Sequence, residues 1–529
     1  MWGPLMQMNR RAFLAGTLAA AASTTAVLRA PRAAAAPGRI PLTRDSRRVV
    51  VIGSGFGGGV TALRLARAGV PVLVLERGIR WPTGPNAHTF PGITSLDERA
   101  SWMNSGLFFD LPTPSRRFTG LLERVQGSGM AIMCAAGVGG GSLVYQGMSL
   151  QPSAEVFAAT FPAGLDYAHL DRVYYPRVAR MLGLATAPDE LIRSAPYAAA
   201  RLFARNARAA GYRVEKVPMP IDWSYALREL HGEMRPSYTN GDCALGVNNG
   251  GKHTVDVTYL ARAEATGLVE VAPLHQVVDI ARDGDAWTVR VERIDTGGVV
   301  QEVKLITART LVLAAGSANT TRLLVRAAGR GQIDDLPDGL GSGWGSNGDQ
   351  IYTWTDLTES FGAPQGGPVI YSSKDWSDPA KATTVIQASV PPLPGNDRTT
   401  MLVGYGVSSG RGVFRYDARQ DEALLDFPGD ADAGVAGRIH ERLTRIAGPA
   451  SLLLNTSTLD TTTWHPLGGA CMGPVCDLDG RVHGQRGLYV LDGALMPGTT
   501  AACNPSMTIA AIAERALDNL VRHDVDSVI

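Results

Sequence analysis

The chain has few cysteines, almost no net charge and, outside its first residues, no long apolar run. Its 529 residues include five cysteines, an odd and widely spaced set that excludes a disulfide framework. Cys471 and Cys476 lack the second cysteine or histidine pair that a zinc site needs. The net charge of +1 gives no support for a nucleic-acid partner. What remains is the composition of a globular protein of two or three domains, with free thiols and no metal site.

Residues 1–36 have the pattern of a twin-arginine export signal. The arginines at positions 10 and 11 precede a weakly apolar run over residues 12–28, and the alanines at 33–36 offer a cleavage site. The pattern predicts a secreted protein that is exported already folded. The alternative is a membrane anchor, which is disfavoured because the run is short, rich in alanine and followed by arginines.

A β-α-β unit for binding a dinucleotide follows the signal. Residues 49–52 are a short apolar, largely β-branched run, typical of a strand buried on both faces. Residues 53–58 then read Gly-x-Gly-x-x-Gly, residues 57–68 have helical spacing, and residues 72–75 form a second buried strand that ends in Glu76.

Each part of this unit has a physical role in binding. Gly53 permits the tight turn, Gly55 lets the backbone approach a pyrophosphate, and Gly58 lets the helix pack closely on the strand. The helix N-terminus supplies amide donors to the phosphates. Glu76 can accept the ribose hydroxyls, and its charge disfavours NADP. The alternative is a glycine-rich turn without a ligand.

The order of the expected elements predicts an α/β fold. A Rossmann-type dinucleotide-binding domain is expected to be discontinuous, and a second α+β substrate domain to be built on an antiparallel sheet. The nucleotide-binding domain is assigned residues 47–155, 265–340 and 460–529, and the substrate domain residues 156–264 and 341–459. The expected strands cover 268–273, 276–280, 287–291, 305–314 and 488–493, several more lie within 341–448, and the expected helices cover 152–184, 197–210, 319–327 and 508–521.

Several further motifs occur in the order found in a known family. With the first glycine motif and Glu76, they are residues 137–148, Ala-Ala-Gly-Ser at 314–317, Trp-His-Pro-Leu-Gly-Gly at 464–469 and Asp-Gly at 492–493. The chain thereby resembles the glucose-methanol-choline (GMC) oxidoreductases, FAD enzymes that oxidise alcohols. Within them it is most similar to the bacterial cholesterol oxidases with non-covalent FAD, on the stretches 139–144, 275–277, 324–327, 343–348, 465–469 and 504–505.

The resemblance implies a set of FAD contacts. The residues expected to contact FAD are Gly53, Gly55, Phe56, Gly57, Gly58, Glu76, Gly141, Tyr145, Gly147, Met148, Val277, Gly316, Asp492, Gly493, Asn504 and Pro505. The family usually has Asn in place of Tyr145 and Gly in place of Gln146, so these two positions depart from the pattern. Met148 has core packing as an alternative role. His88 lies in a region where some relatives attach the flavin covalently.

The reaction needs a group that receives the proton of the alcohol while a hydride leaves for the flavin. His465 is the candidate, because histidine accepts and donates hydrogen bonds near neutral pH. The matching histidine of the resembled enzymes binds the substrate hydroxyl. Asn504 lies 39 positions later. Its amide cannot take the proton but can orient the hydroxyl or tune the flavin.

One family carboxylate is missing. Cholesterol oxidases of this branch have a glutamate before a Pro-x-Pro segment, which moves the proton that shifts the steroid double bond. This chain has Ala388 or Ser389 there, beside Gln387. We therefore expect isomerisation to be weak or absent, or the substrate not to be a Δ5-sterol. Glu359 or Asp375 is the candidate for a compensating acid.

The predicted function is a secreted FAD-dependent alcohol oxidase. It is expected to oxidise the 3β-hydroxyl of cholesterol or a related sterol, to reduce O2 to H2O2 and to act as a monomer. The alternatives are a dehydrogenase on another bulky hydrophobic alcohol with a non-oxygen acceptor, a lyase-like member, and a non-enzymatic lipid-binding flavoprotein. Transient membrane contact is expected through Trp81, Trp102, Phe108 and Phe109, with core packing as the equal alternative.

Overall fold

The computed structural model describes residues 39–107, 116–390 and 396–529. The predicted export signal, Phe108, Phe109 and the Pro-x-Pro segment at 392–394 lie outside these ranges. Residues 41–529 belong to one unit, and everything below concerns that unit.

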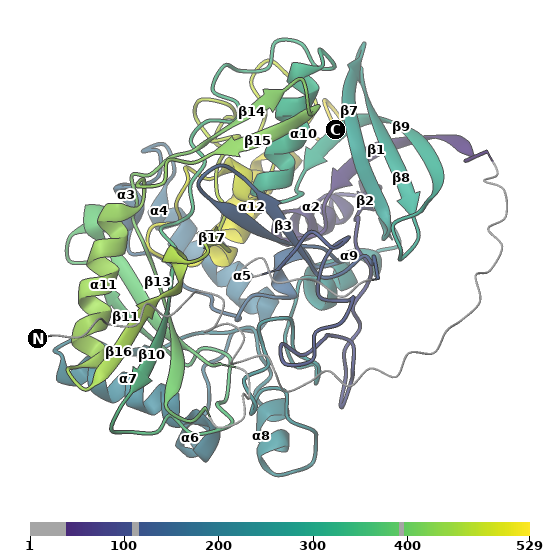
Figure 1. Ribbon diagram of the computed structural model, residues 1–529. Coiled ribbons are helices and arrows are strands. Elements are labelled where there is room, and N and C mark those ends of the chain that lie inside the picture. Colours follow the sequence, from purple (N-terminus) through teal and green to yellow (C-terminus); the bar gives the residue numbers. More distant parts are fainter. Residues whose placement is uncertain (1–38, 108–115, 391–395) are drawn as a thin grey trace, which may run out of the picture. The chain divides into compact units, whose positions relative to one another are not determined.

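The predicted β-α-β unit lies at the centre of a seven-stranded, mostly parallel sheet (Figure 1). The strand order is β6-β2-β1-β9-β8-β7, and β18 also pairs with β9. The strands are β1 (Leu42–Ile52), β2 (Val72–Leu75), β6 (Val269–Ala272), β7 (His275–Asp283), β8 (Ala286–Ile294), β9 (Val300–Leu313) and β18 (Leu488–Val490). Strands from three distant parts of the chain thus share one sheet. Where the predicted domains begin and end stays a prediction.

Several helices pack against this sheet, and α2 (Phe56–Arg67) begins directly after its glycine turn. The others include α10 (Ser317–Gly329), α12 (Ser506–His523), η5 (Asp256–Leu260) and α9 (Ala261–Glu264). α2 packs against both α12 and η5. It buries Val60, Leu63 and Leu65 and carries Arg64 and Arg67 in its last turn, where positive charge favours the helix dipole.

The second sheet is antiparallel, as predicted. Its order is β16-β10-β13-β12-β11-β5 (Figure 1). The strands are β5 (Glu215–Lys216), β10 (Gln350–Asp356), β11 (Tyr371–Asp375), β12 (Thr383–Ala388), β13 (Thr399–Gly406) and β16 (Ser451–Asn455). Helices α7 (Ala198–Ala209) and α11 (Ala433–Ala447) pack against one face of it, where they bury Trp354, Val385 and Leu402. Because side chains alternate along a strand, the residues between these point to the opposite face.

Helix α11 corrects the expectation of strands over most of residues 341–448. Its buried residues include Val435, Ile439, Leu443 and Ile446, at spacings of four and three. That period is helical, so the local pattern favoured a helix.

The expected helix over residues 152–184 is also wrong as a single element. It is divided into α3 (Ala154–Ala158), α4 (Tyr167–His169), the π-helical η3 (Leu170–Tyr174) and α5 (Tyr175–Leu182). Pro162 and Gly164 lie in the break, where neither supports a continuous helix.

A β-hairpin that the sequence did not reveal lies beside the site. β3 (Leu122–Gln126) and β4 (Ala131–Ala135) pair with each other, and β4 pairs in parallel with β17 (Thr462–Thr463). The other short elements are α6 (Asp189–Arg193), α8 (Ser224–Leu230), β14 (Val413–Asp417) and β15 (Glu422–Asp426).

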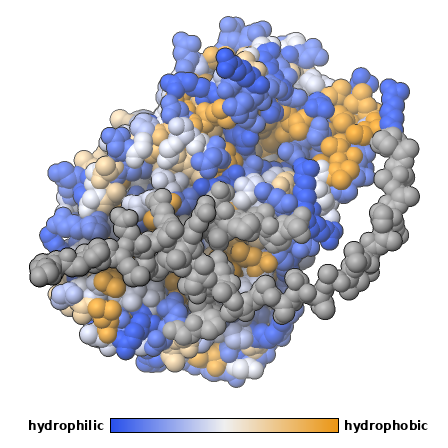
Figure 2. All heavy atoms as spheres, viewed as in Figure 1, coloured by the Kyte–Doolittle hydropathy of each residue, from blue (hydrophilic) through white to orange (hydrophobic). Residues whose placement is uncertain are grey.

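Two of the four aromatic residues predicted to insert into a membrane lie within the described ranges. Trp81 and Trp102 are buried in the core, which overturns the insertion role for these two. Figure 2 shows mostly hydrophilic residues on the visible face, with apolar ones in smaller groups. No helix within the described ranges is long and apolar enough to cross a bilayer. All five cysteines are free thiols.

Candidate active site

A cavity of about 680 Å³ extends from the glycine turn to the second sheet. It brings together most of the residues predicted to form the site. Those that border it are Gly53, Gly55, Phe56, Gly57, Glu76, Gly141, Tyr145, Met148, Val277, Gly316, His465, Asp492, Gly493, Asn504 and Pro505. Gly58 and Gly147 are not among the lining residues.

The first glycine turn is shaped by close backbone contacts. A Cβ atom on Gly53, whose φ is +99°, would lie 2.2 Å from the Ala314 carbonyl oxygen. A Cβ atom on Gly58 would lie 2.1 Å from the Gly53 oxygen, so Gly58 acts through packing of helix on strand. Gly55 is different, since its nearest neighbour would be 3.9 Å away. No side chain caps the start of α2 at Gly55, so its first amides are available to an anion.

Glu76 is buried where the turn meets the second glycine cluster. Its Oε2 accepts hydrogen bonds from the Ser54 amide (3.3 Å) and hydroxyl (2.6 Å). Its Oε1 accepts from the amides of Gly78 (2.9 Å) and Gly137 (3.3 Å). Glu76 therefore holds two loops together in addition to bordering the cavity.

The second glycine cluster lies against the first. A Cβ atom on Gly140 would be 2.8 Å from the Gly55 Cα, whereas one on Gly141 would meet nothing within 4 Å. Tyr145 packs edge-on against Phe56, with 5.7 Å between the ring centroids.

Lys252 is a buried residue beside Tyr145 that the sequence analysis did not predict to lie near the site. Its Nζ lies 4.8 Å from the Tyr145 ring centroid, donates to the carbonyl oxygens of Leu143 (2.9 Å) and Tyr145 (2.5 Å), and burial lowers its pKa to about 7.

Asp492 connects the end of the first sheet to the start of α10. Its Oδ2 accepts from the Gly316 amide (2.8 Å) and the Thr320 hydroxyl (2.6 Å), and its Oδ1 accepts from the Ala494 amide (2.8 Å). Burial raises the pKa of Asp492 to about 6, against the opposing effect of these hydrogen bonds.

The Asn504 amide is engaged by two backbone groups and one hydroxyl at the edge of the cavity. Its Oδ1 accepts from the Leu150 amide (3.0 Å), and its Nδ2 donates to the Met148 carbonyl (2.6 Å) and the Ser506 hydroxyl (2.8 Å). Met148 both borders the cavity and belongs to a core cluster, so its two predicted roles coexist.

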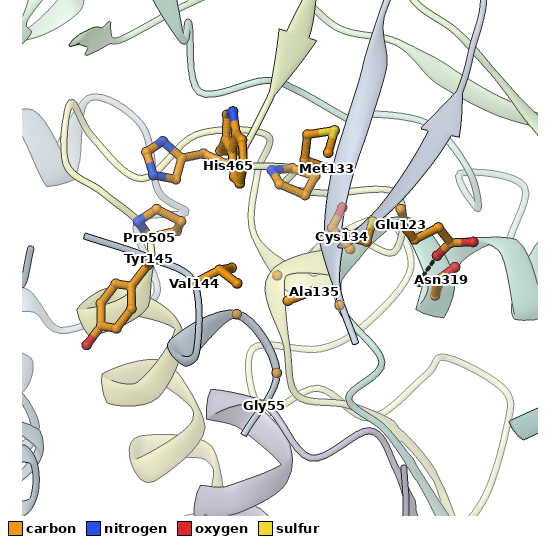
Figure 3. Close-up of a pocket in the computed structure, with 18 of the residues that line it drawn as sticks. Gly55, Glu123, Met133, Cys134, Ala135, Val144, Tyr145, Asn319, His465 and Pro505 are labelled. Carbon is orange, nitrogen blue, oxygen red and sulfur yellow. Dashed lines mark hydrogen bonds between the residues drawn. The ribbon is translucent and has the colours of Figure 1, made fainter. Parts of the chain in front are cut away.

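His465 follows β17 and borders the cavity (Figure 3). It is paired with Asp349, which the sequence analysis missed. The His465 Nδ1 lies 2.7 Å from the Asp349 Oδ1. The side chains of His465 and Asp349 are 15% and 4% exposed. The ring also packs edge-on against Tyr405, with 5.6 Å between centroids. Asp349 directly follows the motif at 343–348 and directly precedes β10. An acidic residue at this position was the signal in the sequence that could have identified it.

The residues expected at the position of the missing glutamate lie at the cavity. Ala388 and Ser389 border the cavity, whereas Gln387 donates to the Thr400 hydroxyl (3.0 Å) behind it. Neither proposed compensating acid borders the cavity. Glu359 pairs with Arg205 near the surface, and Asp375 is exposed at the end of β11.

A buried ion cluster forms another wall and was also missed. Glu123 lies between Arg77 (2.6 Å) and Arg322 (3.7 Å), and Asn319 donates to it at 3.4 Å (Figure 3). Burial opposes ionisation of Glu123, but the two arginines outweigh it and lower its pKa. The sequence could not predict this cluster, because its residues come from β3, from the end of β2 and from α10, which are far apart in the chain.

The chain belongs to the GMC oxidoreductase family. Profiles described as GMC oxidoreductase match residues 116–335 and 440–513, more than half of the chain. This confirms the predicted family resemblance.

The chain is similar to oxidases whose names give different substrates. The chain is 28% identical to a cholesterol oxidase of Mycobacterium tuberculosis (strain ATCC 25618 / H37Rv), over 88% of this chain and 90% of that protein. It is 25% identical to the paromamine 6'-oxidase of Streptomyces fradiae, over 90% and 92%. The pyridoxine 4-oxidase structure from Mesorbium loti superposes with a TM-score of 0.64 at 16% identity, covering 90% of this chain and 99% of that one. This superposition confirms the α/β fold.

The cofactor of the family is FAD, and the cavity fits it. The uncapped amides of α2 suit a pyrophosphate, and the open backbone at Gly55 and Gly141 leaves room for a ligand. When bound, FAD supplies the hydride acceptor for alcohol oxidation. The contact of each residue with FAD stays a prediction.

Proposed function

We propose that the protein oxidises the 3β-hydroxyl of cholesterol or a related sterol to the ketone, with O2 as the electron acceptor and H2O2 as the product. As a GMC oxidoreductase with a flavin-type cavity it is an FAD-dependent alcohol oxidoreductase. The substrate, the acceptor and secretion through the predicted export signal are the parts that we add.

The observation that carries the proposal is the position of His465. Its Nδ1 is engaged by Asp349, and no hydrogen bond within the described ranges engages its Nε2. The ring borders the same cavity as the glycine turn and Asp492. An alcohol held there has a proton acceptor in a cavity that also suits the hydride acceptor.

The wall contributed by the second sheet supports a hydrophobic alcohol. Ile351, Ile386, Ala388, Met401 and Val403 all border the cavity, on the face away from α7 and α11. Burial of a rigid hydrocarbon against such side chains is favourable in proportion to its apolar area, about 25 cal/mol per Å². A polyhydroxylated aminosugar would find few polar partners on this wall. We therefore favour a sterol-like substrate over a paromamine-like one.

The same wall bears on the product. Isomerisation of a Δ5-3-ketone requires a group that carries a proton between two ring carbons. Ala388 and Ser389 occupy the wall where the resembled enzymes have a glutamate, and neither side chain is a base at neutral pH. We propose that the ketone leaves without the double-bond shift.

The test is anaerobic addition of cholesterol to the purified flavoprotein. We expect the flavin absorbance at about 450 nm to bleach, and readmitted oxygen to restore it with release of H2O2. We expect His465→Ala to retain its flavin but to lose about 10²- to 10⁴-fold in the rate of bleaching, because the proton acceptor is gone.

The outcomes separate the proposal from its alternatives. A flavin that cholesterol and a panel of bulky alcohols leave oxidised would refute alcohol oxidation. Bleaching without oxygen consumption would show that the protein is a dehydrogenase with another electron acceptor and not an oxidase. Unchanged bleaching in His465→Ala would remove His465 from the mechanism.

A further inference from the structure

We infer that Asp349 is a positioning residue that fixes His465 in one tautomer, with the proton on Nδ1 and a bare Nε2 facing the cavity. The inference rests on the proposed function for its catalytic meaning. The tautomer itself is a property of the protein without substrate.

The two oxygens of Asp349 have different partners. Oδ2 accepts from the Thr463 hydroxyl (2.9 Å), the Trp464 amide (3.1 Å) and the His465 amide (3.2 Å). Oδ1 faces the His465 Nδ1 at 2.7 Å. Two of the groups at Oδ2 are backbone N–H groups, which can only donate. The carboxylate is therefore held by the same short segment, 463–465, that carries the histidine.

This arrangement determines which ring nitrogen carries the proton. An ionised carboxylate only accepts hydrogen bonds, and a neutral imidazole has one N–H. The short contact with Oδ1 is satisfied only when Nδ1 carries that proton. The opposite tautomer would place the Nδ1 lone pair against a buried negative oxygen. Nε2 is consequently left with its lone pair on the cavity side.

The bare Nε2 can then act as the base. The O–H bond of the alcohol breaks and its proton moves to Nε2. The electron pair of that bond becomes the second C–O bond as the carbon gives up its hydride, which FAD would accept when bound. His465 becomes an imidazolium ion beside the carboxylate of Asp349, and this pairing stabilises the charge that forms.

Replacement of Asp349 by Asn should reverse the tautomer. The Trp464 and His465 amides both donate to this position, the second sharing its proton with the Thr463 hydroxyl (3.0 Å), and an asparagine has a single oxygen to offer them. Its NH2 group then faces Nδ1, which must accept, so the ring proton moves to Nε2. The opposite amide orientation would leave two backbone donors facing an N–H group. The backbone thus selects the orientation that removes the base.

The first test is ¹⁵N NMR of the histidine-labelled, flavin-loaded protein at a pH where His465 is neutral, with the His465 signals assigned by their loss in His465→Asn. We expect a protonated, pyrrole-type Nδ1 and an unprotonated, pyridine-type Nε2 in the wild type, and the reverse in Asp349→Asn. Thr463→Val is the matched control. It removes the hydroxyl that donates to Oδ2 and that also accepts from the His465 amide (3.0 Å), but both backbone amides keep Oδ2 as an acceptor, so the tautomer should not change. A pyrrole-type Nε2 in the wild type overturns the inference, whatever Asp349→Asn shows.

The second test is a double-variant cycle on the rate of flavin reduction. We expect Asp349→Asn to lower this rate by about 10²- to 10⁴-fold in the wild-type background, and by less than about twofold in His465→Ala, because Asp349 acts only through His465. A merely structural role would lower the rate, the flavin content and the thermal stability in both backgrounds alike. If no alcohol reduces the wild type, the proposed function fails, while the NMR result still decides the tautomer.

Discussion

Replacement of Gly57 by alanine tests whether close backbone packing forms the cofactor cavity. A Cβ atom on Gly57 would lie 1.8 Å from the carbonyl oxygen of Leu491 and 3.3 Å from the Cα of Asp492. Ordinary contact begins at 3.4 Å, so the start of α2 and the end of the β18 segment would have to separate by about 1.6 Å. The obstructing atom belongs to the backbone, so no side-chain rotation relieves the contact.

The separation would affect both stability and cofactor binding. Gly57 lies in a helix, where alanine would otherwise gain roughly 0.5–1 kcal/mol. We expect a net loss of about 3 kcal/mol, the upper part of the range for overpacking, because backbone must move. Gly57 and Asp492 both border the cavity, so their displacement should also abolish most FAD binding.

The assay compares flavin content and thermal unfolding with those of a matched control. Gly437→Ala adds the same methyl group to α11, where it would meet nothing within 4 Å. The control should retain its flavin and unfold at the same or a slightly higher temperature. Wild-type flavin content and melting temperature in Gly57→Ala would refute the role assigned to this contact.

Two further changes test other parts of the site. Burial lowers the pKa of Lys252 to about 7 from 10.5. Below about pH 7 the folded protein must bury the charged amine, which lowers its free energy of unfolding. This cost disappears as the pH rises toward 10.5, because the amine is then neutral in the unfolded chain as well as in the folded one. The unfolding free energy of the wild type, relative to Lys252→Met, should therefore increase between about pH 7 and pH 10, and parallel profiles would contradict this. Ser389→Glu places a carboxylate on the cavity wall, so it should add the ultraviolet absorbance of a conjugated enone to the steroid product. Ser389→Gln is the matched control, because glutamine has a similar size to glutamate and no carboxylate. If Ser389→Glu gives the same product as the wild type, this wall is not the site of proton transfer.

Asp349 and the second-sheet wall illustrate that alcohol oxidation and isomerisation depend on different groups. The second-sheet wall has no carboxylate at Ala388 or Ser389, and neither Glu359 nor Asp375 compensates for it. The carboxylate that contacts His465 comes instead from the start of β10. It is oriented by the amides of the histidine segment itself. Alcohol oxidation and isomerisation are thereby separable, since the first needs a base beside the hydroxyl and the second a carrier along the ring.

The sequence by itself determined the local elements around the first glycine turn and the family of the chain. The strand at 49–52, its glycine turn and the following helix and strand were predictable because burial on both faces, left-handed turn geometry and helical period are properties of neighbouring residues. The motifs at 465–469 and 504–505 likewise identified His465 and Asn504, which the structure places on one cavity.

Only the tertiary structure decided which distant residues meet. His465 and Asp349 are 116 positions apart, and Glu123 meets Arg77 and Arg322 from three separate elements. No local period encodes such contacts, because they depend on how the second sheet and the β3–β4 hairpin pack against the first sheet and its helices. The same holds for the partners of Asn504, whose amide is occupied by the backbone around Met148. Residue type suggested what chemistry was possible, and long-range packing determined which atom carries the proton.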